Sequence, residues 1–336
     1  MIVSWLTTNQ CNLKCRHCYQ DAGNKEAKEL TTKEAEKMIG EIKKAGFQIM
    51  IFSGGEPLMR PDIFHLVSYA ARVGLKPVFG TNGTLLTTHA VEALKKSQAA
   101  VMGISIDSLN EEKHNDFRGD PEAFRLTMDG IKNCKKAGLP FQIHTTVMDW
   151  NVREVSNIID FSVASRAIAN YLFFLIPVGR GKFLEETALE VMEYERLLET
   201  IMKKQREVPI DIKPTCAPQF IRVANELGVK TRFSKGCLAG LSYCVISPVG
   251  DVRPCAYMTE SAGEVRKTPF DEIWRNSNLF LQLRTKYYGG KCHDCNYGDT
   301  CGGCRARAAY YHNGDYMAED SYCAYRKSEI GKELNT

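Results

Sequence analysis

The sequence predicts an α/β fold, in which a partial, TIM-like (β/α)6 barrel precedes a small, irregular, cysteine-rich domain. Apolar, β-rich runs alternate with helical patterns over the first two thirds of the 336-residue chain. Repeated strand–helix units of this kind form a parallel sheet with helices outside. After about residue 210 the elements become short, and Cys, Gly and Pro punctuate them. We therefore predict a barrel domain over residues 1–210 and a second domain over residues 211–336.

The barrel units follow from apolar runs and helix-capping signals. The predicted strands are the runs at residues 2–7, 48–53, 76–80, 101–106, 141–147 and 171–176. The predicted helices begin near Thr31 with Glu34 three residues on, near Pro61 (ending at Gly74), at Asp120 (ending at Gly138), at Asn151 with Glu154 three residues on, and near residue 185 (ending near 205). Parallel barrels carry their sites at the carboxyl ends of the strands. The segments that follow each strand are therefore the ones to inspect.

Composition excludes several classes of protein. The net charge of +4 gives no case for nucleic-acid binding, and no apolar run approaches the roughly 20 residues of a membrane span. The N-terminus has no basic region before an apolar core, so we expect no signal peptide and a cytoplasmic protein. Thirteen cysteines are then unusual, because disulfides are rare in a reducing compartment. They cluster at residues 11–18 and 237–323, which indicates metal binding or chemistry.

The first cluster is Cys11-x3-Cys15-x2-Cys18, directly after the first predicted strand. Thiolates suit iron–sulfur clusters or zinc, but a structural zinc site normally takes four protein ligands. Three thiolates would leave one iron of a cubane cluster free to bind a small molecule. The alternative is a zinc knuckle completed by His17 or by a distant residue.

Further motifs follow the next strands in order. Ser53-Gly54-Gly55-Glu56-Pro57 follows the second strand, where glycines let backbone approach a ligand and the carboxylate can accept hydrogen bonds from an ammonium group. Asn82 follows the third strand, Ser105 and Asp107 end the fourth, and Arg118 comes shortly after. A guanidinium at this position suits a carboxylate ligand. A simple turn at Asn82 and a surface ion pair at Arg118 are the alternatives.

Together these motifs resemble the radical S-adenosylmethionine (SAM) superfamily. The triplet matches its C-x3-C-x-Φ-C motif, with His17 at the aromatic position Φ. The resemblance implies that Cys11, Cys15 and Cys18 hold a 4Fe–4S cluster that cleaves SAM to a 5′-deoxyadenosyl radical. It further implies that His17 lies against the adenine, that Gly54, Gly55, Glu56 and Pro57 bind the amino group, that Asn82, Ser105 and Asp107 bind the ribose, and that Arg118 pairs with the carboxylate.

The C-terminal cysteines resemble the SPASM extension of this superfamily, although Cys301 and Cys304 are separated by two residues where the family usually has three. The resemblance implies two auxiliary 4Fe–4S clusters and hence three clusters in all. The nearer cluster would be held by Cys237, Cys244, Cys255 and Cys304, and the outer one by Cys292, Cys295, Cys301 and Cys323. A zinc-binding adaptor module is the alternative from another class of protein.

Cys216 stands outside both clusters, at the predicted join of the two domains. We predict a catalytic role for it, as a donor of a hydrogen atom or as a contact of an extra metal, with a buried structural thiol as the alternative. His144 ends the fifth strand and could face the cavity, but a single strand histidine is more often structural.

The substrate is indicated by resemblance alone. Segments around His144, Cys216 and Cys301 are similar to the haem d1 and alternative-haem branch, which implies removal of side-chain carboxylate or acetate groups from a sirohaem-derived tetrapyrrole. Arg305 and Arg307 could then meet substrate carboxylates, or form a solvated helix face. A ferredoxin or flavodoxin would supply electrons. A peptide maturase that forms thioether or carbon–carbon links is the alternative.

Overall fold

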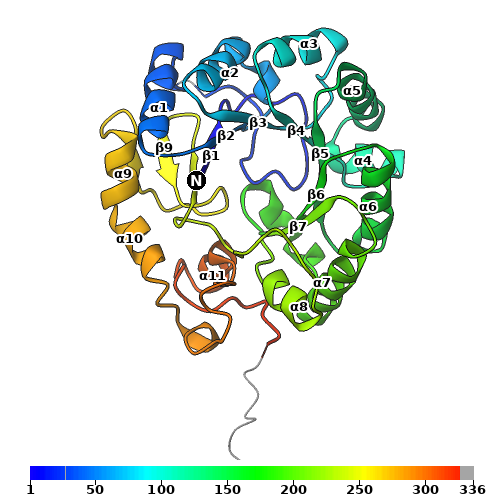
Figure 1. Ribbon diagram of the computed structural model, residues 1–336, viewed down its shortest axis with the longest axis vertical. Coiled ribbons are helices and arrows are strands. Elements are labelled where there is room, and N and C mark those ends of the chain that lie inside the picture. Colours follow the sequence, from blue (N-terminus) through cyan, green and yellow to red (C-terminus); the bar gives the residue numbers. More distant parts are fainter. Residues whose placement is uncertain (27, 326–336) are drawn as a thin grey trace, which may run out of the picture.

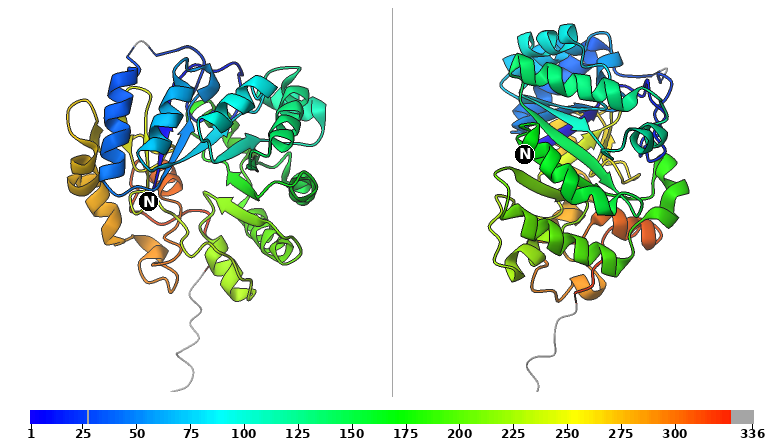
Figure 2. Two further views of the ribbon diagram at one scale, coloured as in Figure 1. Left: turned by 45° about the horizontal axis from the view of Figure 1, so that its top comes forward. Right: turned by 90° about the vertical axis from the view of Figure 1, so that its right-hand side faces the viewer.

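A computed structural model describes residues 1–26 and 28–325 and confirms the predicted α/β class (Figure 1). Ten strands form one sheet in the order β10-β9-β8-β1-β2-β3-β4-β5-β6-β7. All pairs from β8 through β1 to β7 are parallel, whereas β9 and β10 pair antiparallel. The sheet curves into a barrel with helices on its outside (Figures 1 and 2). Within the described residues the edge strands β10 and β7 are not paired with each other, so the barrel is open.

The six predicted strands are confirmed to within two residues. They are β1 (Ile2–Leu6), β2 (Ile49–Ser53), β3 (Lys76–Thr81), β4 (Val101–Ser105), β5 (Phe141–Val147) and β6 (Ala169–Phe174). Four more strands lie beyond residue 210: β7 (Asp211–Thr215), β8 (Tyr243–Ile246), β9 (Asp251–Arg253) and β10 (Gly263–Glu264). The predicted domain boundary falls between α7 and β7. The hydrogen-bonded sheet continues past it, because β7 pairs with β6 and β8 pairs with β1.

Eleven α-helices accompany the sheet in the described residues, and most of them lie on its outer side (Figure 1). They are α1 (Thr32–Lys44), α2 (Ile63–Arg72), α3 (Thr88–Lys96), α4 (Glu111–Arg118), α5 (Ala123–Ala137), α6 (Val155–Ala164), α7 (Val191–Gln205), α8 (Phe220–Glu226), α9 (Phe270–Asn276), α10 (Asn278–Thr285) and α11 (Arg305–Tyr311). Thr31 and Glu34 form the predicted capping box of α1. In the described part of the chain, no helix has the length and apolar character needed to cross a bilayer.

A helical turn begins after Asn151 as predicted, but the capping hydrogen bond that its spacing to Glu154 suggested is absent. Instead the amide nitrogen of Asn151 donates to the carbonyls of Asp107 and Thr146, at 2.9 and 2.8 Å. Asn151 therefore fixes the ends of two neighbouring strands, which is a tertiary role that no local pattern encodes.

The two faces of the curved sheet differ. Phe141 and Ile143 of β5 point outward into the main hydrophobic core beneath the helices. The alternate residues of the same strand, Gln142 and His144, are only half-buried and face the inside of the barrel. Tyr171 and Phe173 continue this pattern on β6. The inner face of the barrel is thus lined by polar and aromatic side chains instead of a packed apolar core.

Candidate active site

The three N-terminal thiols lie together in the loop that follows β1. Cys11, Cys15 and Cys18 pack in one small cluster with Leu13 and Ala123. Each sulfur accepts one N–H donor: the Leu13 amide reaches Cys11 Sγ at 3.5 Å, the Ala22 amide reaches Cys18 Sγ at 3.4 Å, and Arg118 Nη1 reaches Cys15 Sγ at 3.8 Å. Burial raises the pKa of the Cys11 thiol to about 11. N–H donors favour thiolates, and this donor set fits ligands of an iron–sulfur cluster.

The glycine pair after β2 brings two backbone segments into close contact. A Cβ atom on Gly55 would lie 2.2 Å from the carbonyl oxygen of Gln10, and one on Gly54 would lie 2.6 Å from that of Thr8. The Gly55 and Glu56 amides donate to the Thr8 and Gln10 carbonyls, both at 2.8 Å. These contacts fix the segment that leads directly to Cys11. The glycines therefore set the position of the cysteine loop.

Glu56 is fully buried at the end of β2. Its carboxylate accepts hydrogen bonds from the Thr81 hydroxyl at 2.9 Å, the Asn82 amide at 3.0 Å and the Leu58 amide at 3.2 Å. Burial nevertheless raises its pKa to about 7. A buried carboxylate without a cationic partner is suited to receive an ammonium group.

Asp107 and Arg118 are each other's partners. Arg118 Nε and Nη2 bind Asp107 Oδ2 at 2.7 and 2.6 Å, and both side chains are buried. Burial opposes the charge of Asp107, but Arg118 lowers its pKa below the usual value. The other oxygen of Asp107 accepts the Thr146 amide at 2.8 Å. Arg118 is therefore not a surface residue, and its Nη1 is the nitrogen that faces Cys15.

The remaining predicted SAM-binding residues lie beside the cysteine loop. The His17 ring stacks on Phe117, with centroids 4.3 Å apart, and burial lowers its pKa to about 3. Its Nδ1 is buried without a hydrogen-bond partner among the described residues. Asn82 donates to Asn12 Oδ1 at 2.9 Å, so it contacts the cysteine loop directly. Ser105 donates to the Thr81 carbonyl at 3.2 Å.

A second group of thiols lies where β7 ends. Cys216 and Cys255 pack against a small core that contains Cys304. The neighbouring Cys304 thiol and burial raise the pKa of Cys216 well above its usual value. Burial, followed by the nearby Cys304 thiol, raises the pKa of Cys237. Cys216, Cys237, Cys255 and Cys304 therefore lie near one another.

Cys244, which was predicted to share a cluster with Cys237, Cys255 and Cys304, packs in a different part of the structure from Cys304. Cys244 lies on β8, where it is opposite Val3 of β1, and both are fully buried in the main hydrophobic core. Burial raises the pKa of Cys244, and the charge of Arg284 opposes this shift. No other thiol contributes to it. The sequence motif placed Cys244 by spacing, but β-strand alternation turns its side chain away from the barrel interior.

The thiols of the predicted outer quartet lie near one another. A Cβ on Gly303 would lie 3.6 Å from Cys292 Sγ. Burial is the main cause of the raised pKa of Cys301, and the thiols of Cys323 and Cys292 add to it. Burial is also the main cause of the raised pKa of Cys292, and the Cys295 thiol adds to it. Their role as cluster ligands stays a prediction.

Asp320 lies between the two groups of thiols. Its Oδ2 accepts the Cys304 amide and the side chain of Gln219, both at 2.7 Å, and pairs with Arg307 at 3.2 Å. Arg307 and Arg305 are each 1% exposed, so the expected solvated helix face is wrong. Because Asp320 neutralises Arg307, that side chain is not free to meet a substrate carboxylate.

No three His, Cys, Asp or Glu side chains among the described residues converge closely enough to hold a single metal ion.

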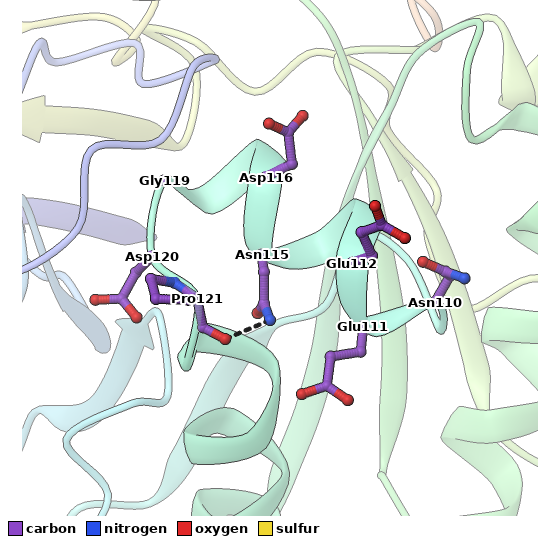
Figure 3. A pocket seen from close by; sticks show the side chains of 8 residues that line it. All are labelled: Asn110, Glu111, Glu112, Asn115, Asp116, Gly119, Asp120 and Pro121. Atoms are coloured by element: carbon purple, nitrogen blue, oxygen red, sulfur yellow. Dashed lines mark hydrogen bonds between the residues drawn. The ribbon is translucent and has the colours of Figure 1, made fainter.

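An acidic hollow of about 810 Å³ lies on the outer surface at α4 (Figure 3). It is lined by Asn110, Glu111, Glu112, Asn115, Asp116, Gly119, Asp120 and Pro121. None of the predicted site residues lines it. The candidate active site is therefore the thiol-bearing inside of the barrel and not this surface hollow.

Sequence reasoning missed two aromatic residues of the site. Tyr19 follows Cys18, and its ring lies 5.1 Å from that of Tyr257. The Tyr19 side chain lies near Ser53 at the end of β2. Tyr19 comes one residue after the predicted ligand Cys18, and Tyr257 comes two residues after the predicted ligand Cys255. These positions are the only sequence feature that could have identified the two tyrosines.

Comparison with known proteins agrees with this geometry. Residues 5–162 match the radical SAM superfamily, and residues 237–296 match the SPASM iron–sulfur cluster-binding domain. The first match implies SAM and a 4Fe–4S cluster, and the second implies additional iron–sulfur binding. The crystal structure of Streptococcus suis SuiB bound to its precursor peptide SuiA has the same fold, with a TM-score of 0.79 at 19% identity over 96% of this chain and 76% of that chain.

Two curated relatives from Methanosarcina barkeri match nearly the whole chain. The AdoMet-dependent heme synthase is 42% identical over 97% of this chain and 96% of that protein. The Fe-coproporphyrin III synthase is 29% identical over 98% of this chain and 89% of that protein. The chain is therefore a radical SAM enzyme, and it belongs to the SPASM-bearing branch of that superfamily in which the AdoMet-dependent heme synthases lie.

Proposed function

We propose that this enzyme removes carboxyl groups from the side chains of an iron-containing tetrapyrrole, and that its product is haem. The observation that supports this proposal most is the set of three thiols at the carboxyl ends of the parallel strands, each of which accepts an N–H donor. These thiols lie in a chain that is 42% identical to a heme synthase. Iron coproporphyrin III carries propionates at positions where haem carries vinyl groups, so it is the proposed substrate.

The cysteine loop and its neighbours would hold SAM and the first cluster. When bound, the reduced cluster and SAM supply a radical able to abstract hydrogen from an unactivated carbon. Glu56 would accept hydrogen bonds from the SAM ammonium group, because it is buried and has no cationic partner. Arg118 Nη1, which faces Cys15, would donate its second hydrogen to the SAM carboxylate, while Asp107 positions the guanidinium. The neutral His17 ring suits stacking against a purine.

The inside of the barrel supports a flat, apolar, acidic substrate. His144, Tyr171 and Phe173 form an aromatic wall, with ring centroids 5.2–5.4 Å from the histidine. Gly103 leaves room for this wall, since a Cβ there would lie 2.3 Å from the His144 ring. Lys213 Nζ lies 4.4 Å from the ring centroids of both Phe220 and Phe233. Aromatic faces suit a macrocycle, and a lysine among them suits its carboxylates.

We further propose two auxiliary 4Fe–4S clusters, for a total of three, and a ferredoxin or flavodoxin as electron donor. The two thiol groups at the end of β7 and around Cys301 support this count. Loss of a hydrogen atom and carbon dioxide from a propionate leaves one electron to be removed. Closed clusters near the barrel interior would provide an acceptor.

The test is turnover of iron coproporphyrin III and of didecarboxysirohaem by anaerobically reconstituted enzyme with SAM and a reductant. We expect mass spectrometry to show loss of carboxyl groups from one tetrapyrrole, together with 5′-deoxyadenosine. The variant with Cys11, Cys15 and Cys18 replaced by alanine should form neither product. Formation of 5′-deoxyadenosine with both tetrapyrroles unchanged would reject the substrate and leave peptide modification as the better candidate.

A further inference from the structure

The backbone at Cys216 is held in an unusual conformation. Its φ of 59° is in the left-handed region, which non-glycine residues seldom adopt. Arg307 Nη2 donates to the Cys216 carbonyl at 2.7 Å, and Asp320 fixes Arg307 in turn. Such conformations persist where surrounding structure enforces them, most often at functional sites. Here the enforced turn lies at the carboxyl end of β7.

The turn places the Cys216 thiol among three other thiols. Cys216 and Cys255 both contact the small core that contains Cys304, and the Cys304 thiol raises the pKa of Cys216. Cys237 lies beside them, because its amide donates to the Cys301 carbonyl at 3.1 Å and, after burial, the Cys304 thiol raises its pKa.

Cys244 is excluded from this group by strand geometry. Neighbouring residues of β8 point to opposite faces of the sheet. Tyr243 faces the barrel interior, where Cys255 and Tyr19 are its neighbours, so Cys244 faces the helices. It is fully buried in the main core, opposite Val3. A rotation of the strand that exposed Cys244 to the interior would move Tyr243 into the hydrophobic core.

We propose that Cys216 is the fourth ligand of the nearer auxiliary cluster, together with Cys237, Cys255 and Cys304, and that Cys244 is a structural core thiol. The proposal rests on the proposed function, which assigns a cluster to this group. A closed cubane takes four thiolates, one for each iron. The fourth ligand then comes from β7 of the barrel, so the cluster joins the barrel to the cysteine-rich segment. A ligand thiolate is not a free donor of hydrogen atoms, and this replaces the catalytic role predicted for Cys216.

The test uses the full chain with Cys11, Cys15 and Cys18 replaced by alanine, so that only auxiliary clusters remain. After anaerobic reconstitution this background should hold about eight irons per chain, four for each cubane. Cys216→Ala and Cys244→Ala are then compared in that background, with Cys134→Ala as a buried thiol outside both groups. Iron content and the electron paramagnetic resonance (EPR) spectrum of the reduced protein are measured for each variant.

We expect Cys216→Ala to lose iron and to change one of two EPR signals, with the signal of the outer quartet retained as proof of folding. Cys244→Ala and Cys134→Ala should keep about eight irons and both signals. Cys216→Ser, which conserves size, should keep the fold and shift the same signal. Full iron and an unchanged spectrum in both Cys216 variants would overturn the proposal, as would selective loss in Cys244→Ala. A background that holds only about four irons would instead reject the auxiliary-cluster count in the proposed function.

Discussion

The ring of Tyr19 lies 5.1 Å from the ring of Tyr257, at an interplanar angle of 58°. Tyr19 directly follows Cys18, and Tyr257 comes two residues after Cys255. Tyr257 also packs against the small core that contains Cys304. These two rings therefore form the contact between the N-terminal thiols and the second thiol group, along the inside of the barrel.

Replacing Tyr257 should uncouple SAM cleavage from substrate turnover. Tyr257→Ala removes the ring that separates the two thiol groups, so the bound substrate loses its fixed position while the cysteine loop is untouched. We expect the ratio of tetrapyrrole product to 5′-deoxyadenosine to fall about tenfold, the effect of a modest misplacement of reacting groups. Both compounds can be measured by chromatography in one assay. Tyr287→Ala, at an exposed tyrosine in the same half of the chain, should leave the ratio unchanged.

The glycine at position 55 should be required for the first cluster. Gly55→Ala places a Cβ 2.2 Å from the Gln10 carbonyl oxygen, and that backbone must move. Because Gln10 precedes Cys11, we expect the variant to lose about four irons per chain, those of one cubane. Gly23→Ala is the matched control in the same loop, since nothing lies within 4 Å of its added Cβ. Equal iron contents in the two variants would contradict this account of the glycine pair.

Glu56 should make the stability of the cluster-free protein depend on pH. Burial raises its pKa from 4.5 to about 7, so the folded state resists ionisation that the unfolded chain accepts. The stability contributed by the protonated form is fully present below pH 4.5 and is lost as pH rises through about 7. The loss is on the order of 3 kcal/mol. Urea unfolding at pH 5 and pH 8 should show it in the wild type, and Glu56→Gln should reduce the difference between the two pH values by about this amount.

The sequence predicted the barrel well because its strands and helices carry local signals. The six predicted strands alternate with amphipathic helices whose caps, such as Thr31 and Glu34, are encoded within four residues. β7 was missed because Lys213 and Pro214 break an apolar pattern. Proline is tolerated there because β7 is an edge strand, where a missing amide leaves no partner unpaired.

The site was predicted through motifs, and the errors lie where spacing does not determine geometry. Cys244 has the spacing of a ligand, but the pairing of β8 with a strand more than 230 residues earlier turns it into the core. Contacts between residues far apart in the chain cannot be predicted from local sequence patterns. The placement of Cys216 beside Cys304 could therefore not be predicted either. Asp107 and Arg118 were both identified, but their mutual ion pair depends on how α4 packs over the end of β4.

Asp320 should stabilise both groups of C-terminal thiols at once. Its carboxylate accepts the Cys304 amide and pairs with Arg307, and it also lies near the Cys292 thiol. Asp320→Asn leaves Arg307 buried without a counter-charge, a change that typically costs about 3–5 kcal/mol. We expect a lower thermal midpoint and loss of the auxiliary irons.

The N-terminal thiols, held by a separate set of contacts, should keep about four irons in Asp320→Asn. Asp299→Asn is the control, because Asp299 lies in the same cysteine-rich segment and its side chain is 89% exposed. Replacing Asp320 and Arg307 together by asparagine and methionine should recover part of the lost stability, since no buried charge then remains. If the single variant kept all its iron and its thermal midpoint, the buried ion pair would have no part in holding the two thiol groups, and their positions would depend on the backbone alone.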